Sequence, residues 1–355
     1  MTSISSIFSY LIPSPSDLSF LNSKIEPAVN IHKQNDLIEG IPDGILALIL
    51  PVLVYWTYSI FFHIVDIYHL AEKYRIHPSE EVLSRNKVSL SIVIRDVISQ
   101  HIIQSIAGFV FYKLEPTPMT GFEKNDMWNL KNSNSILNLI LLNNNYLIYF
   151  YYNFATSFFK ILIGFLIIDT WQFNLHRLMH INKYLYKRFH SRHHRLYVPY
   201  AFGALFNDPV EGFLLDTVGA GLASLIGNLT PRENIILYCF STMKTVDDHC
   251  GYSLPFDLFQ IIFPNNSLYH DIHHQHFGIK SNFSQPFFTF WDNLFGTTYH
   301  GFDSYKEEQK QITLDKYKQF LKERKQIRVK SEISNHQDIK EYSDSDDEPD
   351  SKKKN

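Results

Sequence analysis

Apolar residues are concentrated in the first two-thirds of the chain, where they form long runs separated by short polar stretches. The strongest run covers residues 44–67 and is interrupted only near its end, by His63 and Asp66. About 20 apolar residues are enough to cross the hydrocarbon core of a bilayer as a helix. This run therefore predicts a first membrane span.

Basic residues flank this span unequally. They are Lys73, Arg75, Arg85 and Lys87 on the far side, against Lys24 and Lys33 on the near side. Because cytosolic flanks are enriched in Lys and Arg, the pattern predicts that residues 70–88 lie in the cytosol and the N-terminus in the lumen.

Residues 89–112 carry a polar stripe on an otherwise apolar helix. The stripe consists of Arg95, Asp96, Gln100, His101 and Gln104. A charge at mid-bilayer costs roughly 2.5–3.5 kcal/mol on insertion scales, so a helix in the membrane interface competes with a span. Residues 135–152 and 154–172 predict a pair of crossing helices that enters and leaves on the same face. We therefore expect 89–112 to lie in the interface, because the pair fits the topology only then.

Residues 212–229 and 232–248 predict a second helical pair, which is split by Asn228-Leu-Thr-Pro231. Pro231 suits the first turn of the returning helix. A hairpin that dips into the membrane and returns would bring His249 to the same face as the histidines that precede the pair.

The two ends of the chain differ in character. Residues 1–40 are mixed and lack a basic region at their start, so they predict a short arm rather than a cleaved signal peptide. Residues 306–355 predict a polar cytosolic tail, with a short helix over 313–328 and disorder elsewhere because few residues could be buried. The whole pattern predicts an all-α integral membrane helical bundle.

Composition agrees with a membrane-embedded chain and removes some classes of function. Aromatic residues make up 15% of it, which suits helices that face lipid and its interfaces. The net charge of -3 and the lack of a basic stripe predict no nucleic-acid partner. The two cysteines, Cys239 and Cys250, cannot form a disulfide framework or a four-thiolate metal site, so we expect free thiols.

Histidines are the candidate chemistry of this sequence. Ten of the 17 lie between His176 and His276. Spacings of three and four residues place side chains on one face of a helix, so each cluster could direct two or three imidazoles to one place. The nine predicted metal ligands are His176, His180, His190, His193, His194, His249, His270, His273 and His274.

The remaining histidines are not predicted to bind metal. His276 breaks the repeated spacing and is set aside. His63, His69, His77, His101 and His300 lie outside the spacing and are expected to be ordinary polar residues.

Nine imidazoles imply two metals, because one metal takes about four to six ligands. Imidazole suits zinc, copper, iron and nickel. A structural zinc site usually closes with four ligands, often cysteines, so the surplus favours a redox-active pair with open positions. The Glu-x-x-His pairs of the carboxylate di-iron bundles are absent, which indicates a histidine-rich variant with a di-metal cap on the bundle.

Ligating imidazoles usually give their other N–H to a carboxylate or a carbonyl group. The candidates for this supporting role are Asp169, Asp208, Glu211, Asp247, Asp248 and Asp271. Asp208, which precedes Pro209, could equally cap the helix that starts near Val210.

The histidine motifs resemble those of the fatty acid hydroxylase superfamily of membrane di-iron oxygenases, over roughly residues 155–300. The family's histidine followed by Gly-Tyr also stands here, at His249-Cys-Gly-Tyr252. The segments 190–213 and 274–292 look most like the sphingolipid C4-hydroxylase branch. Asp208-Pro209 stands where the sterol branch often has His-Pro.

The resemblance implies an endoplasmic-reticulum enzyme that hydroxylates C4 of sphinganine or dihydroceramide to give phytosphingosine-type bases. It implies two irons per chain, O2 as co-substrate, and electrons from NADPH or NADH through cytochrome b5 and its reductase. No fused cytochrome b5 signature is present, so the donor would be separate. The corresponding domains are an arm at 1–40, membrane anchor and interfacial helices at 41–152, the catalytic domain at 153–305, and the polar cytosolic tail at 306–355.

Other functions stay open at this point. A sterol methyl oxidase or desaturase, or a fatty acyl 2-hydroxylase, would use the same di-iron scaffold. A non-catalytic metal-binding membrane protein would need the histidines but no O2. The final residues, 352–355, resemble a dilysine retrieval signal for the endoplasmic reticulum. Such a signal requires a cytosolic C-terminus, which is the side where we also expect the histidine-rich di-metal cap.

Overall fold

The structure, a computed structural model, describes residues 11–141 and 143–344 and is almost wholly helical, as the sequence predicts. The α-helices are α2 (Asp43–Ile67), α3 (Ser79–Arg85), α4 (Leu90–Leu114), α5 (Glu123–Asn132), α6 (Ile136–Ile140), α7 (Asn145–Phe150), α8 (Thr156–Ile181), α9 (Lys183–Arg188), α10 (Pro209–Gly212), α11 (Gly219–Ile226), α12 (Pro231–Asp248), α13 (Leu258–Ile262), α14 (Ser267–His274), α15 (Phe290–Phe295) and α16 (Phe302–Asp344).

Shorter elements connect these helices. The 3-10 and π turns are η1 (Ser19–Asn22), η2 (Glu72–Tyr74), η3 (Tyr151–Ala155), η4 (His190–Arg195), η5 (Ala201–Leu205) and η6 (Phe213–Val218). Two short strands, β1 (His32–Lys33) and β2 (Met119–Thr120), pair antiparallel, with His32 opposite Thr120.

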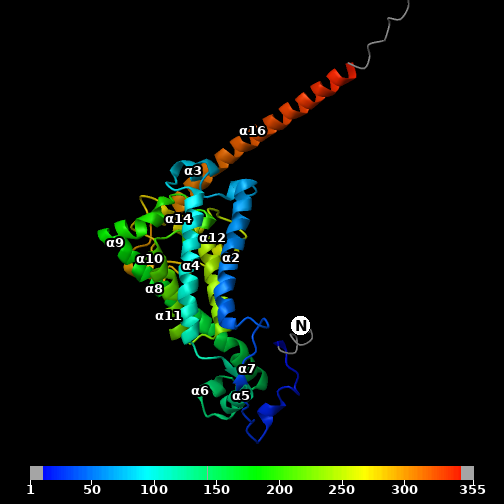
Figure 1. Cartoon of the computed structure of the whole chain (residues 1–355), viewed down its shortest axis with the longest axis vertical. Helices are drawn as coiled ribbons and strands as arrows, with labels where there is room; N and C mark the ends of the chain where they lie inside the picture. Colours follow the sequence, from blue (N-terminus) through cyan, green and yellow to red (C-terminus); the bar gives the residue numbers. More distant parts are fainter. Residues whose placement is uncertain (1–10, 142, 345–355) are drawn as a thin grey trace, which may run out of the picture.

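Three helical segments of the described chain are long and apolar enough to cross a membrane: Asp43–Ile67, Asn145–Ile181 and Pro209–Ile226. In Figure 1 they stand upright together with α4 and α12, and α9, α10 and α14 gather at one end of the bundle. The connection that contains α3 lies at this same end. Residues 70–88 and the histidine-bearing elements therefore share one side, as expected.

Helix α4 runs along α2 instead of lying across the bundle. It is not among the helices that are apolar enough to be candidate spans, so the interfacial placement of 89–112 stays a prediction. Tyr112 lies against Gly44 at one end, and the rings of Tyr55 and His101 are 5.0 Å apart near the middle. Part of the polar stripe faces protein, because Gln100 and His101 are only 2% and 8% exposed, whereas Arg95 is exposed. Sequence alone does not distinguish a polar face packed on other helices from one that faces headgroups.

The expected pair at 135–152 and 154–172 is wrong. A single helix of α7, the π turn η3 and α8 replaces it, while α6 lies separately. Asn144 caps the start of this helix by accepting hydrogen bonds from the N–H groups of Tyr146 and Leu147. Because no glycine or proline interrupts residues 146–163, the helix continues past the expected break at residue 153.

The second pair is confirmed, with its first helix starting slightly earlier than expected. Asp208 caps α10 by accepting from the N–H of Val210, and Pro209 occupies the first turn. Helix α10 continues through η6 into α11. Thr230 and Glu233 form a capping box at the start of α12, which returns the chain to the histidine-bearing end.

The opposite end of the bundle is closed by the N-terminal arm and α5–α7 (Figure 1). Leu18 and Leu21 of the arm are buried against Met127 and Ile148. The β1–β2 pair ties the arm to the segment that follows α4.

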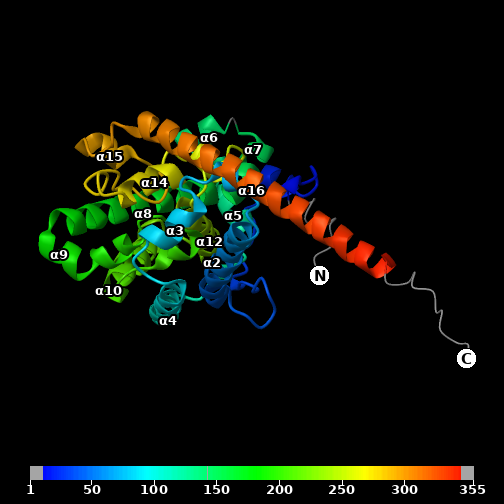
Figure 2. The same cartoon turned by 90° about the horizontal axis from the view of Figure 1, so that it is seen from above.

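The C-terminal region is more helical than expected, since α16 covers Phe302–Asp344 instead of a short stretch near 313–328. It begins over α14 and α3 and then projects away from the bundle (Figures 1 and 2). Strong helix formers and pairs one turn apart, such as Gln319 with Glu323, stabilise it without a core. The expected disorder of the last residues and the dilysine signal at 352–355 fall outside the described residues.

Candidate metal centre

Four elements bring the predicted ligands together at one end of the bundle. Helix α8 carries His176 and His180 one turn apart near its C-terminus, and η4 carries the second cluster. His249 directly follows α12, where the hairpin delivers it as expected, and α14 carries the last cluster. All nine predicted ligands lie in this one place.

The nine histidines form two groups, and within each group the candidate ligand atoms lie within 4.8 Å of one another. The first group is His176, His180, His190, His194 and His273, and the second is His193, His249, His270 and His274. Each His-x-x-His-His motif is therefore divided between the groups, whereas we expected each cluster to point to one place. Neighbouring residues differ by about 100° around a helix axis, so adjacent histidines face different centres.

Backbone carbonyl groups fix the orientation of five of these rings. The Nδ1–O distances are 2.8 Å for His176 to Phe283, 3.2 Å for His193 to Phe206, 2.8 Å for His249 to Thr245, 2.7 Å for His273 to Ser281 and 2.7 Å for His274 to Leu196. A carbonyl oxygen can only accept, so each Nδ1 carries the hydrogen. The Nε2 atom of each ring is left as an unprotonated acceptor.

The Nε2 atoms then face one another. Those of His176 and His190 are 3.1 Å apart, and those of His270 and His274 are also 3.1 Å apart. The Nε2 of His273 is buried without a hydrogen-bond partner among the described residues. Lone pairs gathered in this way repel unless a cation lies between them. The residues therefore fit two bound metal ions, one for each group.

Burial keeps these rings neutral. It lowers the pKa of His190, His193 and His194 well below the ordinary value, and nearby imidazoles lower it further. The same causes lower the pKa of His270, His273 and His274 on α14. Metal binding requires an unprotonated imidazole, so the site is prepared for a metal at neutral pH.

The carboxylates predicted to support the ligands have different contacts. Glu211 accepts a hydrogen bond from Nδ1 of His190, which is the expected role. Asp208 caps α10, as the alternative predicted. Asp169 accepts from the backbone N–H groups of Phe287 and Phe288. On α12, Asp248 pairs with Lys244, and Asp247 accepts from the side chain of Gln260. Asp271 contacts His77 and Tyr305.

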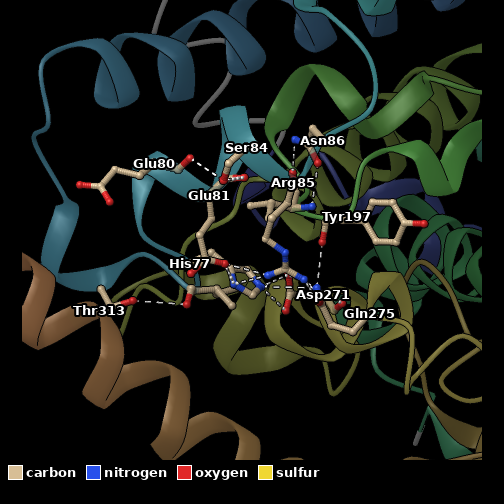
Figure 3. A network of polar contacts seen from close by, with 12 residues as sticks. His77, Glu80, Glu81, Ser84, Arg85, Asn86, Tyr197, Asp271, Gln275 and Thr313 are labelled. Carbon is tan, nitrogen blue, oxygen red and sulfur yellow. Dashed lines mark hydrogen bonds and ion pairs between the residues drawn. The ribbon is translucent and has the colours of Figure 1, made fainter.

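Asp271 belongs to a buried polar network that anchors α14 (Figure 3). Its carboxylate lies 3.0 Å from Nε2 of His77 and accepts from the hydroxyl of Tyr305 at 2.7 Å. Arg85 reaches Gln275, the residue that follows α14. His77 was expected to be an ordinary polar residue and is not in either metal group, but it joins three distant segments. Local spacing gave no signal for this role.

Asp292 was missed by the sequence reasoning. It accepts from the backbone N–H groups of Phe283 at 3.0 Å and Ser284 at 2.7 Å, and from the hydroxyl of Tyr269 at 2.9 Å. It therefore holds the loop whose carbonyl group orients His176. A carboxylate just after an aromatic run was the available signal, although no periodicity marks it as buried.

Two adjoining cavities lead away from the metal groups. A polar cavity of about 30 Å³ borders His190, His193, His249 and His270. A mostly apolar cavity of about 440 Å³ lies between α2, α4, α11 and α12. The two have five lining residues in common, namely Gln172, Ala204, Asp216, Thr245 and Pro286. The histidine groups thus open onto a space suited to an apolar chain.

Known proteins are similar to this chain in the region that contains the histidines. Residues 161–297 match the fatty acid hydroxylase family. The chain is 57% identical over 316 residues to the sphingolipid C4-hydroxylase of Saccharomyces cerevisiae, which covers 89% of both chains. It is 39% identical over 258 residues to sphinganine C4-monooxygenase 1 of Arabidopsis thaliana, with 73% of this chain and 88% of the relative covered.

More limited similarity extends to methylsterol monooxygenase 1 of Rattus norvegicus, at 35% identity over 151 residues, or 41% of this chain and 47% of the relative. No solved structure matches the chain. The matched region contains all nine histidines of the two groups, and the strongest of these similarities extends over nearly the whole chain. The chain therefore belongs to the fatty acid hydroxylase family.

Proposed function

We propose that this chain is a sphingolipid C4-hydroxylase, a membrane oxidoreductase that inserts one oxygen atom of O2 at C4 of a sphinganine-type chain. The observation that carries the proposal is the pair of histidine groups beside an elongated apolar cavity. Two relatives that match most of this chain, from Saccharomyces cerevisiae and Arabidopsis thaliana, are named for hydroxylation at C4.

The family and the two histidine groups indicate iron, and we propose one iron in each group. Bound iron would supply the oxidising power that cleavage of an unactivated C–H bond requires, because no acid–base side chain can do this. The protein's own residues have other tasks. Carbonyl groups and Glu211 hold the imidazoles in place, and burial keeps the rings neutral and limits access of water.

The apolar cavity would hold the hydrocarbon chain of the substrate. Its lining residues on α12 extend from Pro231 to Val246, which corresponds to about 22 Å along a helix. One leaflet of a bilayer spans roughly 15 Å of hydrocarbon. The cavity is therefore long enough for a single lipid chain with its head toward the histidines.

The proposed enzyme lies in the endoplasmic reticulum membrane with its histidine end and C-terminus in the cytosol. The basic residues near 70–88, which share that end of the bundle, support this orientation. Cytochrome b5 and its reductase would deliver electrons from NADPH or NADH at this surface, where a soluble electron-donor domain can approach the histidines.

The test compares two histidines of this region in cells that lack their own C4-hydroxylated bases. Membranes that carry His193→Ala are expected to lose hydroxylation and iron, because His193 belongs to the second group. His276→Ala is the matched control, since His276 is exposed and lies in neither group. The C4-hydroxylated bases are measured by lipid mass spectrometry, and iron per chain by elemental analysis of purified protein, with two expected.

Each rival function has its own result in this experiment. Full activity of the His193→Ala protein would contradict the metal assignment. One tightly held zinc without O2-dependent turnover would favour a non-catalytic metal-binding protein. Oxidised sterols or 2-hydroxylated acyl chains in place of C4-hydroxylated bases would favour a sibling reaction on the same scaffold.

A further inference from the structure

The junction between the two cavities is polar in an otherwise apolar wall. Gln172, Asp216 and Thr245 line both cavities at this point. Asp216 belongs to the π turn η6, and its Oδ1 lies 3.3 Å from the side-chain nitrogen of Gln172. Its Oδ2 is buried and has no hydrogen-bond partner in the part of the chain that the structure describes.

The other carboxylates near the junction are bonded to residues of the metal region. Glu211 accepts from Nδ1 of His190 through one oxygen, its other oxygen is also buried without a hydrogen-bond partner among the described residues, and it lines only the small cavity. Asp248 pairs with the buried ammonium group of Lys244. In the described part of the chain, the hydrogen-bond partner of the Asp216 carboxylate is the neutral side-chain amide of Gln172. Among the described residues, no Lys or Arg lines either cavity. A carboxylate removed from water without a counter-charge is costly, so a cation from the ligand would be strongly favoured here.

A free long-chain base carries such a cation. The ammonium group on C2 is three covalent bonds from C4, the carbon that the proposed reaction oxidises. A group that binds this ammonium must therefore border the same small cavity as the metal-facing histidines. Asp216 does so, together with His190, His193 and His270.

The large cavity has one other lining carboxylate, Glu115. It follows the C-terminus of α4, where Tyr112 and Gly44 also line the wall. His101 is another residue of α4 that lines this cavity, nearer to the histidine end. Glu115 lies 14 positions after His101, which corresponds to about 21 Å along the helix. An ammonium group held at Glu115 would place C4 at the wrong end of the cavity.

We infer that Asp216 binds the ammonium group of the lipid and so selects free long-chain bases over their uncharged N-acyl forms. Gln172 holds the carboxylate in position from α8. The hydrocarbon chain then extends away from the junction into the apolar cavity. This inference rests on the proposed function for the choice of C4, while the charge recognition itself is a property of the cavity.

The test measures binding and turnover of sphinganine and of N-acetylsphinganine, a neutral analogue, on one preparation of the detergent-solubilised full chain. The natural chain is expected to bind sphinganine more tightly. Asp216→Asn should reduce that preference by about 30-fold or more, as expected for loss of a desolvated charge partner. The ratio of the two dissociation constants does not depend on the fraction of folded protein. Glu115→Gln is the matched control and should leave the ratio unchanged.

The outcomes separate this inference from the proposed function. Equal binding preference in the natural chain and in Asp216→Asn would overturn the inference, even if C4-hydroxylated product forms. Loss of preference in Glu115→Gln instead of Asp216→Asn would also overturn it, since the lipid would then lie the other way round. An Asp216-dependent preference without any C4-hydroxylated product would support the ammonium site and remove the proposed reaction.

Discussion

At the scale of single residues, the two nitrogens of five of the nine imidazoles have separate tasks, and this makes distant residues important for the site. Nδ1 bonds a backbone carbonyl group, and Nε2 is left for the metal. The position of a ligand therefore depends on loops that never touch the metal. Asp292 secures one such loop, and Asp271 anchors α14 through His77.

His77 is expected to make the stability of the protein depend on pH. Burial alone would lower its pKa, but the carboxylates of Asp271 and Glu81 outweigh burial and raise it to about 9, from 6.5. The charged ring therefore stabilises the fold fully below pH 6.5, and this contribution disappears as the pH rises through about 9. The shift corresponds to roughly 3 kcal/mol.

The measurement is the thermal unfolding midpoint between pH 6.5 and pH 9. The natural chain should lose more stability over this range than His77→Gln, whose side chain cannot titrate. Parallel curves for the two proteins would show that the His77 network does not supply this stability.

At the scale of elements, apolar runs predicted most of the helices but not how their polar faces are used. The charge argument for α4 assumed that Arg95 and Asp96 lie at mid-bilayer. They lie in its second turn at the histidine end, where Nε of Arg192 donates to Asp96 at 2.9 Å. Such a partner is 96 positions away, so no local pattern could reveal it. The caps at Asp208 and Thr230 are local, and they were visible in the sequence.

Helix α12 ends with a buried ion pair between Lys244 and Asp248, and Asp248 directly precedes His249. The side chains of Lys244 and Asp248 are 0% and 3% exposed. Removing one partner from a buried pair leaves an uncompensated charge and typically costs about 3–5 kcal/mol. Lys244→Met should therefore lower the thermal midpoint strongly and reduce iron binding at the second group.

The double variant Lys244→Met/Asp248→Asn should recover most of the lost stability, because no unpaired charge remains. A double variant as unstable as Lys244→Met alone would mean that packing of the lysine stem, and not the charge pair, accounts for the effect.

At the scale of the whole molecule, the nine histidines could be found in the sequence, but their division into groups of five and four could not. The division depends on how η4 and α14 are rotated against α8, which is a tertiary property. The cavity was also beyond local reasoning, since helices far apart in the sequence form its walls.

Gly221 offers a way to shorten that cavity. It lines the wall on α11, and a Cβ added there would meet nothing within 4 Å. The side chain of Gly221→Leu should enter the space of the lipid chain. Each methylene group displaced costs about 0.8 kcal/mol, so displacement of two would lower activity on long bases about tenfold relative to short ones.

The readout is the ratio of products from long and short bases supplied together to one preparation, which is insensitive to the amount of folded enzyme. An unchanged ratio would place the end of the lipid chain elsewhere.

The π turn η6, which contains Asp216, has a consequence for how this family can diversify. A π turn holds one residue more than an α-helical turn. Deleting one residue within Phe213–Val218 would rotate the following helix by about 100° relative to Glu211. Glu211 would keep His190 in place while new side chains turned toward the lipid. A one-residue alignment gap at this position would therefore mark relatives that inherited the metal site and changed their substrate.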